Sequence, residues 1–409
     1  GIDWRRILGS RDKNWLLGTY TPGTFYAHAL SELSGANARL KAAFRFNRTY
    51  TLSVLNNTTN QYFFVNGHDL TGNSGNKAPP GRLGIGGSDL SADTSDSQIS
   101  EVVAYDRALT LTERQQVEDY LTARYGITDE GFAGPVWSGG SGSGSLWSDS
   151  ANWQQPMPAT PMLAFNANSR RTSTNDLTGL VLDSVMVWDQ AWQFAGNPVT
   201  LNNGFFCNPS STVTWGLDTA LPSGTHTFSV LTARRLTLSG VLSGEGGLLL
   251  GLGRDYAGTL ALACPSNTFT GSVVLKSGIA EVTRLANAGQ PSSLGAASGP
   301  NATVLLGNRR FSLSGGVRYV GVDPATTDRP FSFVRLASID NSSPSGAGLT
   351  FNGAWAAADI TNAGNAYLSL SGTSAGVNTL NASLANAPGG LNALIVNVKG
   401  GVWAFTQPS

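Results

Sequence analysis

The feature that most restricts the fold of this chain is a series of short leucine- and valine-rich runs with glycine between them. In each run, apolar side chains can line one face of a short β-strand, and glycine allows the backbone angles of tight corners. The pattern predicts a right-handed parallel β-helix, in which every strand stacks on the strand one coil below. The same spacing also suits an antiparallel sandwich, but few two-residue hairpin turns separate the runs. The runs recur every ten to thirteen residues, at Leu236-Thr-Leu238, Leu248-Leu-Leu250, Leu260-Ala-Leu262 and Val273-Val-Leu275.

Charge divides the chain near residue 130. Residues 1–130 carry 27 charged side chains, whereas residues 131–409 carry 25 over twice the length. The glycine- and serine-rich stretch 138–145 provides a plausible joint. Lys+Arg and Asp+Glu number 26 each, so no net field draws nucleic acid or anionic lipid. No apolar run approaches the ~18 residues of a membrane helix, and the start at Gly1–Trp4 does not read as a signal peptide, so we expect an excised or processed stretch.

The N-terminal part predicts strands and one helix. Tyr50–Leu55 and Gln61–Val65 form a predicted hairpin, followed by strands at Arg82–Gly87 and Ile99–Tyr105. A helix is predicted over about 110–125. Thr110 and Glu113 form a capping box there, and Gly126 occupies the left-handed position after the last turn. Three apolar residues are expected to line one face of this helix: Val117, Leu121 and Tyr125.

Several of these segments resemble a known domain. The resemblance is to the C-terminal half of a LamG-like, concanavalin A-type jelly roll, and it covers roughly residues 1–127. It implies a partial antiparallel sandwich over 1–130 that lacks several N-terminal strands, and a structural role for Tyr105–Arg107. It is carried by Asn66-Gly67, Gly84–Gly87, Ile99–Leu109 and the helix Thr110–Ile127.

The C-terminal part is similar to the passenger-associated strand repeats of bacterial autotransporters and related large surface proteins. That family forms right-handed parallel β-helices. The resemblance therefore implies an all-β chain, with a β-helix over 131–290 and a degenerate second repeat over 291–409, where Leu368–Gly372 echoes Leu236–Gly240. Its motifs are Trp137-Ser-Gly-Gly140, Trp147–Trp153, Thr174–Asp176, Phe194–Leu201, Leu236–Leu248, Gly258–Leu262 and Asn267–Gly271.

Two candidate binding sites lie in the N-terminal part. Exposed aromatic rings can stack on sugars, and the candidates are Trp4, Trp15, Tyr20 and Tyr62; a core role is the alternative for each. The acidic loop with Asp89, Asp93 and Asp96 offers the oxygen ligands that Ca²⁺ prefers, although its spacing is not that of an EF-hand and a solvated loop is the alternative. No other cofactor is expected.

Residues that carry catalysis are not grouped in the sequence. Glu101 and Asp106 are five positions apart, so a strand would place them on opposite faces. His28 and His68 lie near no nucleophile motif. Cys207 and Cys264 are 57 positions apart, and they are interpreted as buried thiols or, in an oxidising compartment, as one disulfide.

We therefore expect a non-catalytic, extracellular bacterial surface protein. In this hypothesis it serves as a structural or adhesive module, a stalk, surface layer or filament subunit that binds itself or neighbouring surface proteins. The alternative is a carbohydrate-binding, lectin-like module on a β-helical spacer. A third hypothesis is a polysaccharide-degrading enzyme. The sparse charge over residues 131–409 argues against it.

Overall fold

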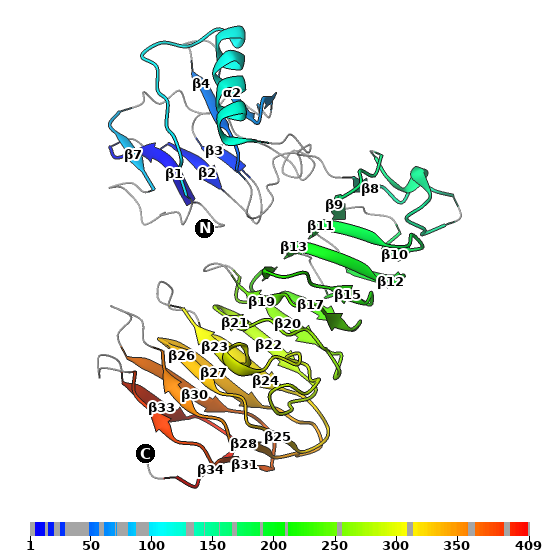
Figure 1. Ribbon diagram of the computed structural model, residues 1–409, viewed down its shortest axis with the longest axis vertical. Coiled ribbons are helices and arrows are strands. Elements are labelled where there is room, and N and C mark those ends of the chain that lie inside the picture. Colours follow the sequence, from blue (N-terminus) through cyan, green and yellow to red (C-terminus); the bar gives the residue numbers. More distant parts are fainter. Residues whose placement is uncertain are drawn as a thin grey trace. The chain divides into compact units, whose positions relative to one another are not determined.

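The computed structural model shows two compact units, Gly1–Gly134 and Pro135–Ser409, each with its own core (Figure 1). The structure describes residues 5–12, 15–19, 25–28, 49–56, 61–69, 71, 81–86, 98–127, 135–142, 144–154, 156–165, 170–188, 191–208, 212–251, 256–308, 314–358, 365–387 and 393–407.

The N-terminal unit contains two small antiparallel sheets. The first has the order β3 (Phe25–His28), β2 (Leu16–Thr19), β1 (Arg5–Ser10) and β7 (Leu83–Ile85). The second has the order β4 (Leu52–Asn56), β5 (Gln61–Val65) and β6 (His68–Asp69). Their apolar faces supply one small core, made of Trp15, Leu17, Ala27, Phe63 and Val65.

The predicted hairpin is confirmed, since β4 and β5 pair antiparallel from Leu52↔Val65 to Asn56↔Gln61. The turn after β5 consists of Asn66 at φ 47° and Gly67 at φ 82°, left-handed angles that asparagine and glycine tolerate. The Asn66 side chain also accepts a hydrogen bond from the Thr51 N–H at 2.9 Å. Local turn chemistry thus fixes the register of this small sheet.

The predicted helix is also confirmed, as α2 (Leu111–Tyr125). Both halves of the capping box are present, because Thr110 Oγ1 accepts from the Glu113 N–H and the Glu113 carboxylate accepts from the Thr110 N–H. Gly126 ends the helix at φ 60°. The expected apolar face differs: Val117, Leu121 and Tyr125 are only half-buried, and the two buried helix residues are Arg114 and Glu118.

The predicted strand at Ile99–Tyr105 is wrong. These residues are described, and they form no strand. In the part of the chain that the structure describes, this segment has no partner strand, and its side chains are exposed or half-buried throughout. Val103, for example, is 43% exposed and Tyr105 51%. The resemblance to a partial, LamG-like jelly roll, which depends on such pairing, is not confirmed.

The C-terminal unit is a parallel β-solenoid, as the sequence predicts, and its strands follow one another from β8 to β34 in Figure 1. One long sheet, here called sheet G, has ten strands: β10 (Thr172–Asn175), β12 (Trp192–Gly196), β14 (Thr212–Trp215), β17 (Arg235–Leu238), β20 (Thr259–Leu262), β22 (Gly278–Val282), β24 (Gly315–Tyr319), β27 (Leu336–Asn341), β30 (Ala366–Ser371) and β33 (Leu394–Val398).

A second long sheet, sheet F, has thirteen strands. Its main path is β8 (Val136–Trp137), β9 (Met162–Phe165), β11 (Leu180–Trp188), β13 (Val199–Asn208), β16 (Thr225–Val230), β19 (Gly247–Leu250), β21 (Val273–Leu275), β23 (Val304–Gly307), β26 (Phe331–Val334), β29 (Trp355–Ala357) and β32 (Leu384–Ala385). The remaining two strands are β15 (Thr219–Ala220) and β18 (Leu242–Ser243).

The third sheet of the solenoid, sheet I, has four strands. They are β25 (Ala325–Thr327), β28 (Leu349–Phe351), β31 (Val377–Leu380) and β34 (Val402–Phe405). Two 3-10 helices lie in the connections, η1 (Ser150–Asn152) and η2 (Gly299–Ala302).

The four leucine- and valine-rich runs noted in the sequence form strands, as predicted. Leu236 pairs with Leu260 in sheet G, and Leu248 pairs with Val273 in sheet F, so successive runs alternate between the two sheets. Inward side chains then stack from coil to coil and stay buried. One such stack in sheet G is Trp192, Val213, Leu236, Leu260, Ala280, Val317, Ile339 and Leu370.

Glycine is required where a corner of one coil presses on the coil below. A Cβ atom on Gly240 would lie 2.2 Å from the Leu217 carbonyl oxygen, and one on Gly372 would lie 2.0 Å from the Asn341 carbonyl oxygen. Both glycines follow a sheet G strand, but the register aligns Leu236 with Leu370 and not with Leu368. The echo between Leu236–Gly240 and Leu368–Gly372 is therefore offset by two residues in the structure, and each glycine forms its own close corner.

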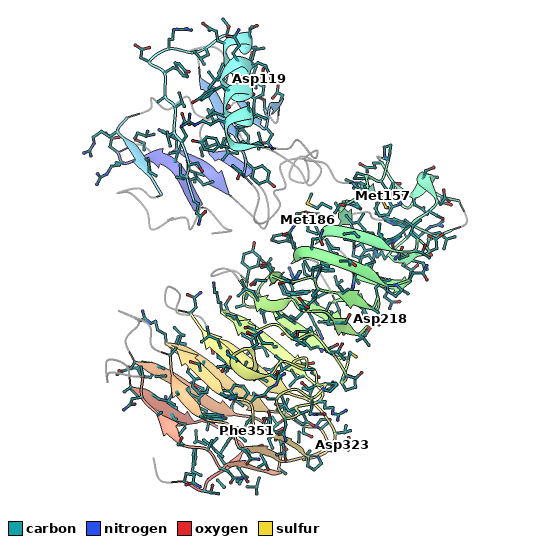
Figure 2. All side chains as sticks on the ribbon, viewed as in Figure 1. Asp119, Met157, Met186, Asp218, Asp323 and Phe351 are labelled. Carbon is teal, nitrogen blue, oxygen red and sulfur yellow. The ribbon has the colours of Figure 1, made fainter. Side chains whose placement is uncertain are left out.

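Aromatic residues fill the two ends of the described solenoid core. Trp137, Trp147 and Trp153 are 0%, 2% and 8% exposed, and Trp153 Nε1 donates to the Trp147 carbonyl at 2.9 Å. Near the other end, Phe351 lies inside the coil (Figure 2), with its ring centroid 5.0 Å from that of Trp355. These rings have structural roles.

Candidate interaction surfaces

The predicted sugar-binding aromatics do not form a group in the structure. Trp15 is 7% exposed and belongs to the small core, so it offers no ring face to a ligand. Tyr62 is half-buried and stacks on Phe64, with ring centroids 6.1 Å apart. Trp4 and Tyr20 lie outside the described residues.

The predicted calcium loop cannot be placed, because Asp89, Asp93 and Asp96 all lie outside the described residues. Within the described ranges, no three His, Cys, Asp or Glu side chains gather as a metal-binding group. No helix in the described part of the chain has the length and apolar character that spanning a bilayer requires. The calcium site stays a prediction.

Sequence reasoning missed a buried ion pair on α2. Arg114 and Glu118 are an i, i+4 pair with side-chain exposures of 9% and 3%, and Arg114 Nη1 donates to Glu118 Oε2. The Arg114 guanidinium also lies over the Phe64 ring, 3.7 Å from its centroid. Charged residues at this spacing ordinarily predict a solvated face, so nothing in the sequence marked the pair as buried.

Glu101, considered above as a catalytic carboxylate, is tied to the helix. Its Oε2 accepts from the Tyr125 hydroxyl at 2.8 Å and lies 3.4 Å from Arg124 Nε. Arg107 similarly binds Glu113 through two hydrogen bonds, of 2.7 and 3.0 Å. Both carboxylates therefore anchor the segment before the helix to the helix itself.

The outer face of sheet G carries rows of mostly polar side chains. Alternation along each strand sends every second side chain outward, and the parallel register places these in rows that cross the sheet. One such row is Thr172, Gln193, Thr214, Thr237, Ala261, Glu281, Arg318, Asp340 and Ser371.

Charges on this face are paired across the coils. Arg235 on β17 binds Glu281 on β22, which holds the pKa of the guanidinium above its ordinary value. The pair passes over β20, and this accounts for the burial of the outward Ala261, at 2% exposure. Asp340 lies 3.4 Å from Arg318 Nε and accepts from Ser371 at 2.8 Å. Each of these two pairs joins a cation and an anion from different strands of the sheet.

Ionisable groups inside the solenoid are unavailable for surface chemistry. Both cysteines are free and buried, and burial raises the pKa of Cys207 well above its ordinary range, so it is no nucleophile. Burial lowers the pKa of His226, whose Nε2 contacts the Pro222 carbonyl at 2.7 Å. Burial also lowers the pKa of Arg329, to about 10.

A comparison with known proteins finds a relative that is similar to part of this chain. The chain is 33% identical over 135 residues to a protein named the adhesin BmaC autotransporter, from Brucella suis biovar 1 (strain 1330). The matched part is 32% of this chain but 4% of that protein, so the chain spans only a small part of the length of its relative. No family model matches the chain, and no solved structure matches it significantly.

Proposed function

We propose that this chain is a non-catalytic, adhesive passenger segment of a secreted or surface-exposed bacterial protein. The observation that carries the proposal is the parallel β-solenoid, together with the 33% identity of part of the chain to a protein named an adhesin. A rigid stack of coils displays the same kind of side chain again and again along one face. That geometry serves binding by contact rather than chemistry.

The outer face of sheet G is the adhesive surface in this proposal. Its rows carry hydroxyl, amide and paired charged groups, which form hydrogen bonds without imposing a net charge. Repeated weak contacts along such a face add up, because each further contact is made within an existing complex. Self-association of the chain, the other expected activity, is proposed on the same principle.

A non-enzymatic role is supported by the positions of the carboxylates. Glu101 and Glu113 are engaged with Arg124 and Arg107, and Glu281 and Asp340 with Arg235 and Arg318. General acid–base catalysis needs a carboxyl group within hydrogen-bond reach of its substrate and a pKa near the working pH. These carboxylates serve as ion-pair partners instead.

The test is an adhesion assay with beads that carry the full 409-residue chain. We expect more beads to bind cultured epithelial cells than albumin-coated beads do. Replacing Thr237 and Ser369 on sheet G by lysine is expected to reduce binding, because both residues point outward and are half-buried on that face. Thr326→Lys with Thr350→Lys, on sheet I, is the matched control.

Binding no greater than that of albumin beads would refute adhesion. Equal loss from both double variants would refute the assignment to sheet G. Sedimentation of the purified chain between low and high concentration tests self-association separately.

A further inference from the structure

The outer face of sheet G contains one group of side chains unlike the rest, on strands β27, β30 and β33. Register defines three rows there. The apolar row is Leu336, Tyr367 and Ile395, the polar row is Ser338, Ser369 and Asn397, and the charged row is Arg318, Asp340 and Ser371, which begins one strand earlier on β24. We call these residues the Tyr367 grid.

Tyr367 is the exposed aromatic residue of this face. It alternates with the buried Ala366 and Leu368 on β30 and is 41% exposed. Leu336 and Ile395, its neighbours across the sheet, are half-buried. The Tyr367 N–H donates to the Arg335 carbonyl, which holds the residue in the sheet. Within the described residues the ring stacks on no other ring, and its exposed part is available to a ligand.

The polar row next to it has unused hydrogen-bonding capacity. In the described part of the chain, the side chains of Ser369 and Asn397 make no hydrogen bond, and Asn397 is exposed. Ser338 accepts from Ser314 at 3.4 Å and keeps its own hydroxyl proton to donate. An amide and two hydroxyls therefore lie two residues along the strands from the aromatic row, roughly 7 Å away.

The charged row contains one ion pair. Arg318 and Asp340 pair with each other, and Asp340 also accepts hydrogen bonds from Ser342 at 2.5 Å and Ser371 at 2.8 Å. Because its oxygens are already occupied, Asp340 is a poor partner for a cation. Because Arg318 is paired, it is a poor partner for an anion.

A flat apolar strip beside a strip of hydroxyl and amide groups matches the chemistry of a sugar ring. A pyranose has faces formed by C–H bonds, which pack on an aromatic ring, and a rim of hydroxyls that both donate and accept hydrogen bonds. A purely apolar ligand would leave the polar row unpaired, and neither the apolar row nor the polar row contains a charged side chain.

We propose that the Tyr367 grid binds a neutral hexopyranose oligosaccharide, with one ring on Tyr367 and its hydroxyls on Ser369 and Asn397. This inference deepens the proposed adhesive function, on which it rests for its biological meaning, by naming the ligand class. It differs from the sequence-based expectation, which placed sugar binding in residues 1–130.

Saturation-transfer NMR on the full chain tests the proposal, with cellotetraose, chitotetraose and a neutral galacto-oligosaccharide as probes and a heparin tetrasaccharide as the charged comparison. We expect at least one neutral probe to bind more tightly than heparin. Tyr367→Ala is expected to weaken that binding by about tenfold or more, because it removes the stacking surface. Tyr367→Phe keeps the ring face and is expected to stay within about threefold of the original affinity.

Asn397→Ala is expected to weaken binding less than Tyr367→Ala, since it removes hydrogen bonds but no stacking surface. Tyr120→Ala is the matched control, because Tyr120 is a similarly exposed tyrosine, at 50%, on α2. Thermal unfolding of each variant checks that the solenoid is intact.

The proposal is overturned if no neutral probe binds, if heparin binds more tightly than all of them, or if Tyr367→Ala and Tyr120→Ala titrate alike. Sugar binding without bead adhesion would refute the proposed function and leave this site standing. Adhesion that Tyr367→Ala does not alter, with no sugar binding, would refute the site alone.

Discussion

The two units bury their side chains in different ways. The N-terminal unit has a core of five buried apolar residues between two small sheets, and its helix contributes a charged pair. The solenoid has one continuous core from Trp137 to Ala387, in which each coil covers the coil before it. The comparison teaches that repetition lets short strands share one large core, whereas a small mixed domain depends on a few individual contacts.

The units also differ in how they satisfy buried charge. Arg114 in the N-terminal unit is paired with a carboxylate, whereas Arg329 in the solenoid, 2% exposed, donates to the carbonyls of Leu294, Gly295 and Ala297. A lone guanidinium is tolerated where main-chain carbonyls converge on it. The turn that contains Leu294, Gly295 and Ala297 supplies such carbonyls in the solenoid.

Removal of a large ring from the shared core is expected to have the largest effect. Trp355 is fully buried and contacts the rings of Phe331, Phe333 and Phe351. Trp355→Ala is expected to lower the free energy of unfolding of the solenoid by about 3–5 kcal/mol. Hydrogen exchange measured by peptide should show the loss concentrated in β26 and β29. An equal loss of protection from exchange in α2 would contradict the distinction between the two units. Val322→Ala, at an exposed position, is the control.

Breaking the ion pair on α2 should destabilise the N-terminal unit by about 3 kcal/mol, because Glu118→Ala leaves the Arg114 charge buried and unpaired. Arg114→Met with Glu118→Leu should cost less than Glu118→Ala alone, since no charge then remains inside. Exchange of the α2 amides measures both. A double variant worse than the single one would mean that the pair itself stabilises the fold.

Arg329→Met should have a smaller effect, about 2 kcal/mol, because it removes hydrogen bonds from a charged donor but leaves no buried charge behind. We expect faster exchange in the loop 292–298 and little change in the N-terminal unit. Arg329→Lys should recover only part of the protection, since an ammonium cannot reproduce the planar fork. Full protection in Arg329→Met would show that the loop does not need this residue.

The smallest expected effect is the pH dependence of stability that comes from Glu113, a residue close to the surface. The hydrogen bonds from Arg107 and then from Thr110 lower its pKa from 4.5 to about 2. The unfolded chain therefore takes up this proton first as the pH falls, so the contribution of Glu113 to stability is present above pH 4.5 and is lost between about 4.5 and 2. NMR titration of the Glu113 carboxyl should show the low midpoint, and Arg107→Ala should move it back toward 4.5. A midpoint near 4.5 in the unsubstituted protein would show that these hydrogen bonds to Glu113 do not form in solution.

The sequence predicted those strands and helix ends that depend on residues close together in the chain. Leu236-Thr-Leu238 and Leu260-Ala-Leu262 are strands because their leucines alternate inward and glycine follows, and Thr110 with Glu113 marks the helix start because both partners lie within one turn. The stretch Ile99–Tyr105 has strand-forming residues but forms no strand, because pairing depends on a second segment.

The candidate site was hidden for a related reason. Tyr367, Ser338 and Asn397 come from three strands joined by connections of unequal length, and only the register of sheet G brings them together. The burial of Arg114 likewise depends on Phe64, fifty positions earlier in the chain. Such neighbours are set by tertiary packing, which periodicity along one segment does not contain.

The glycine corners at Gly240 and Gly372 have an evolutionary consequence. Each allows the chain to turn tightly after a sheet G strand, so a whole turn that carries its own glycine corner is an interchangeable part. Duplicating or deleting such a part would lengthen or shorten the stack by roughly 5 Å while every remaining row keeps its alignment. A lineage carrying this fold can thus vary its reach without inventing a new interior.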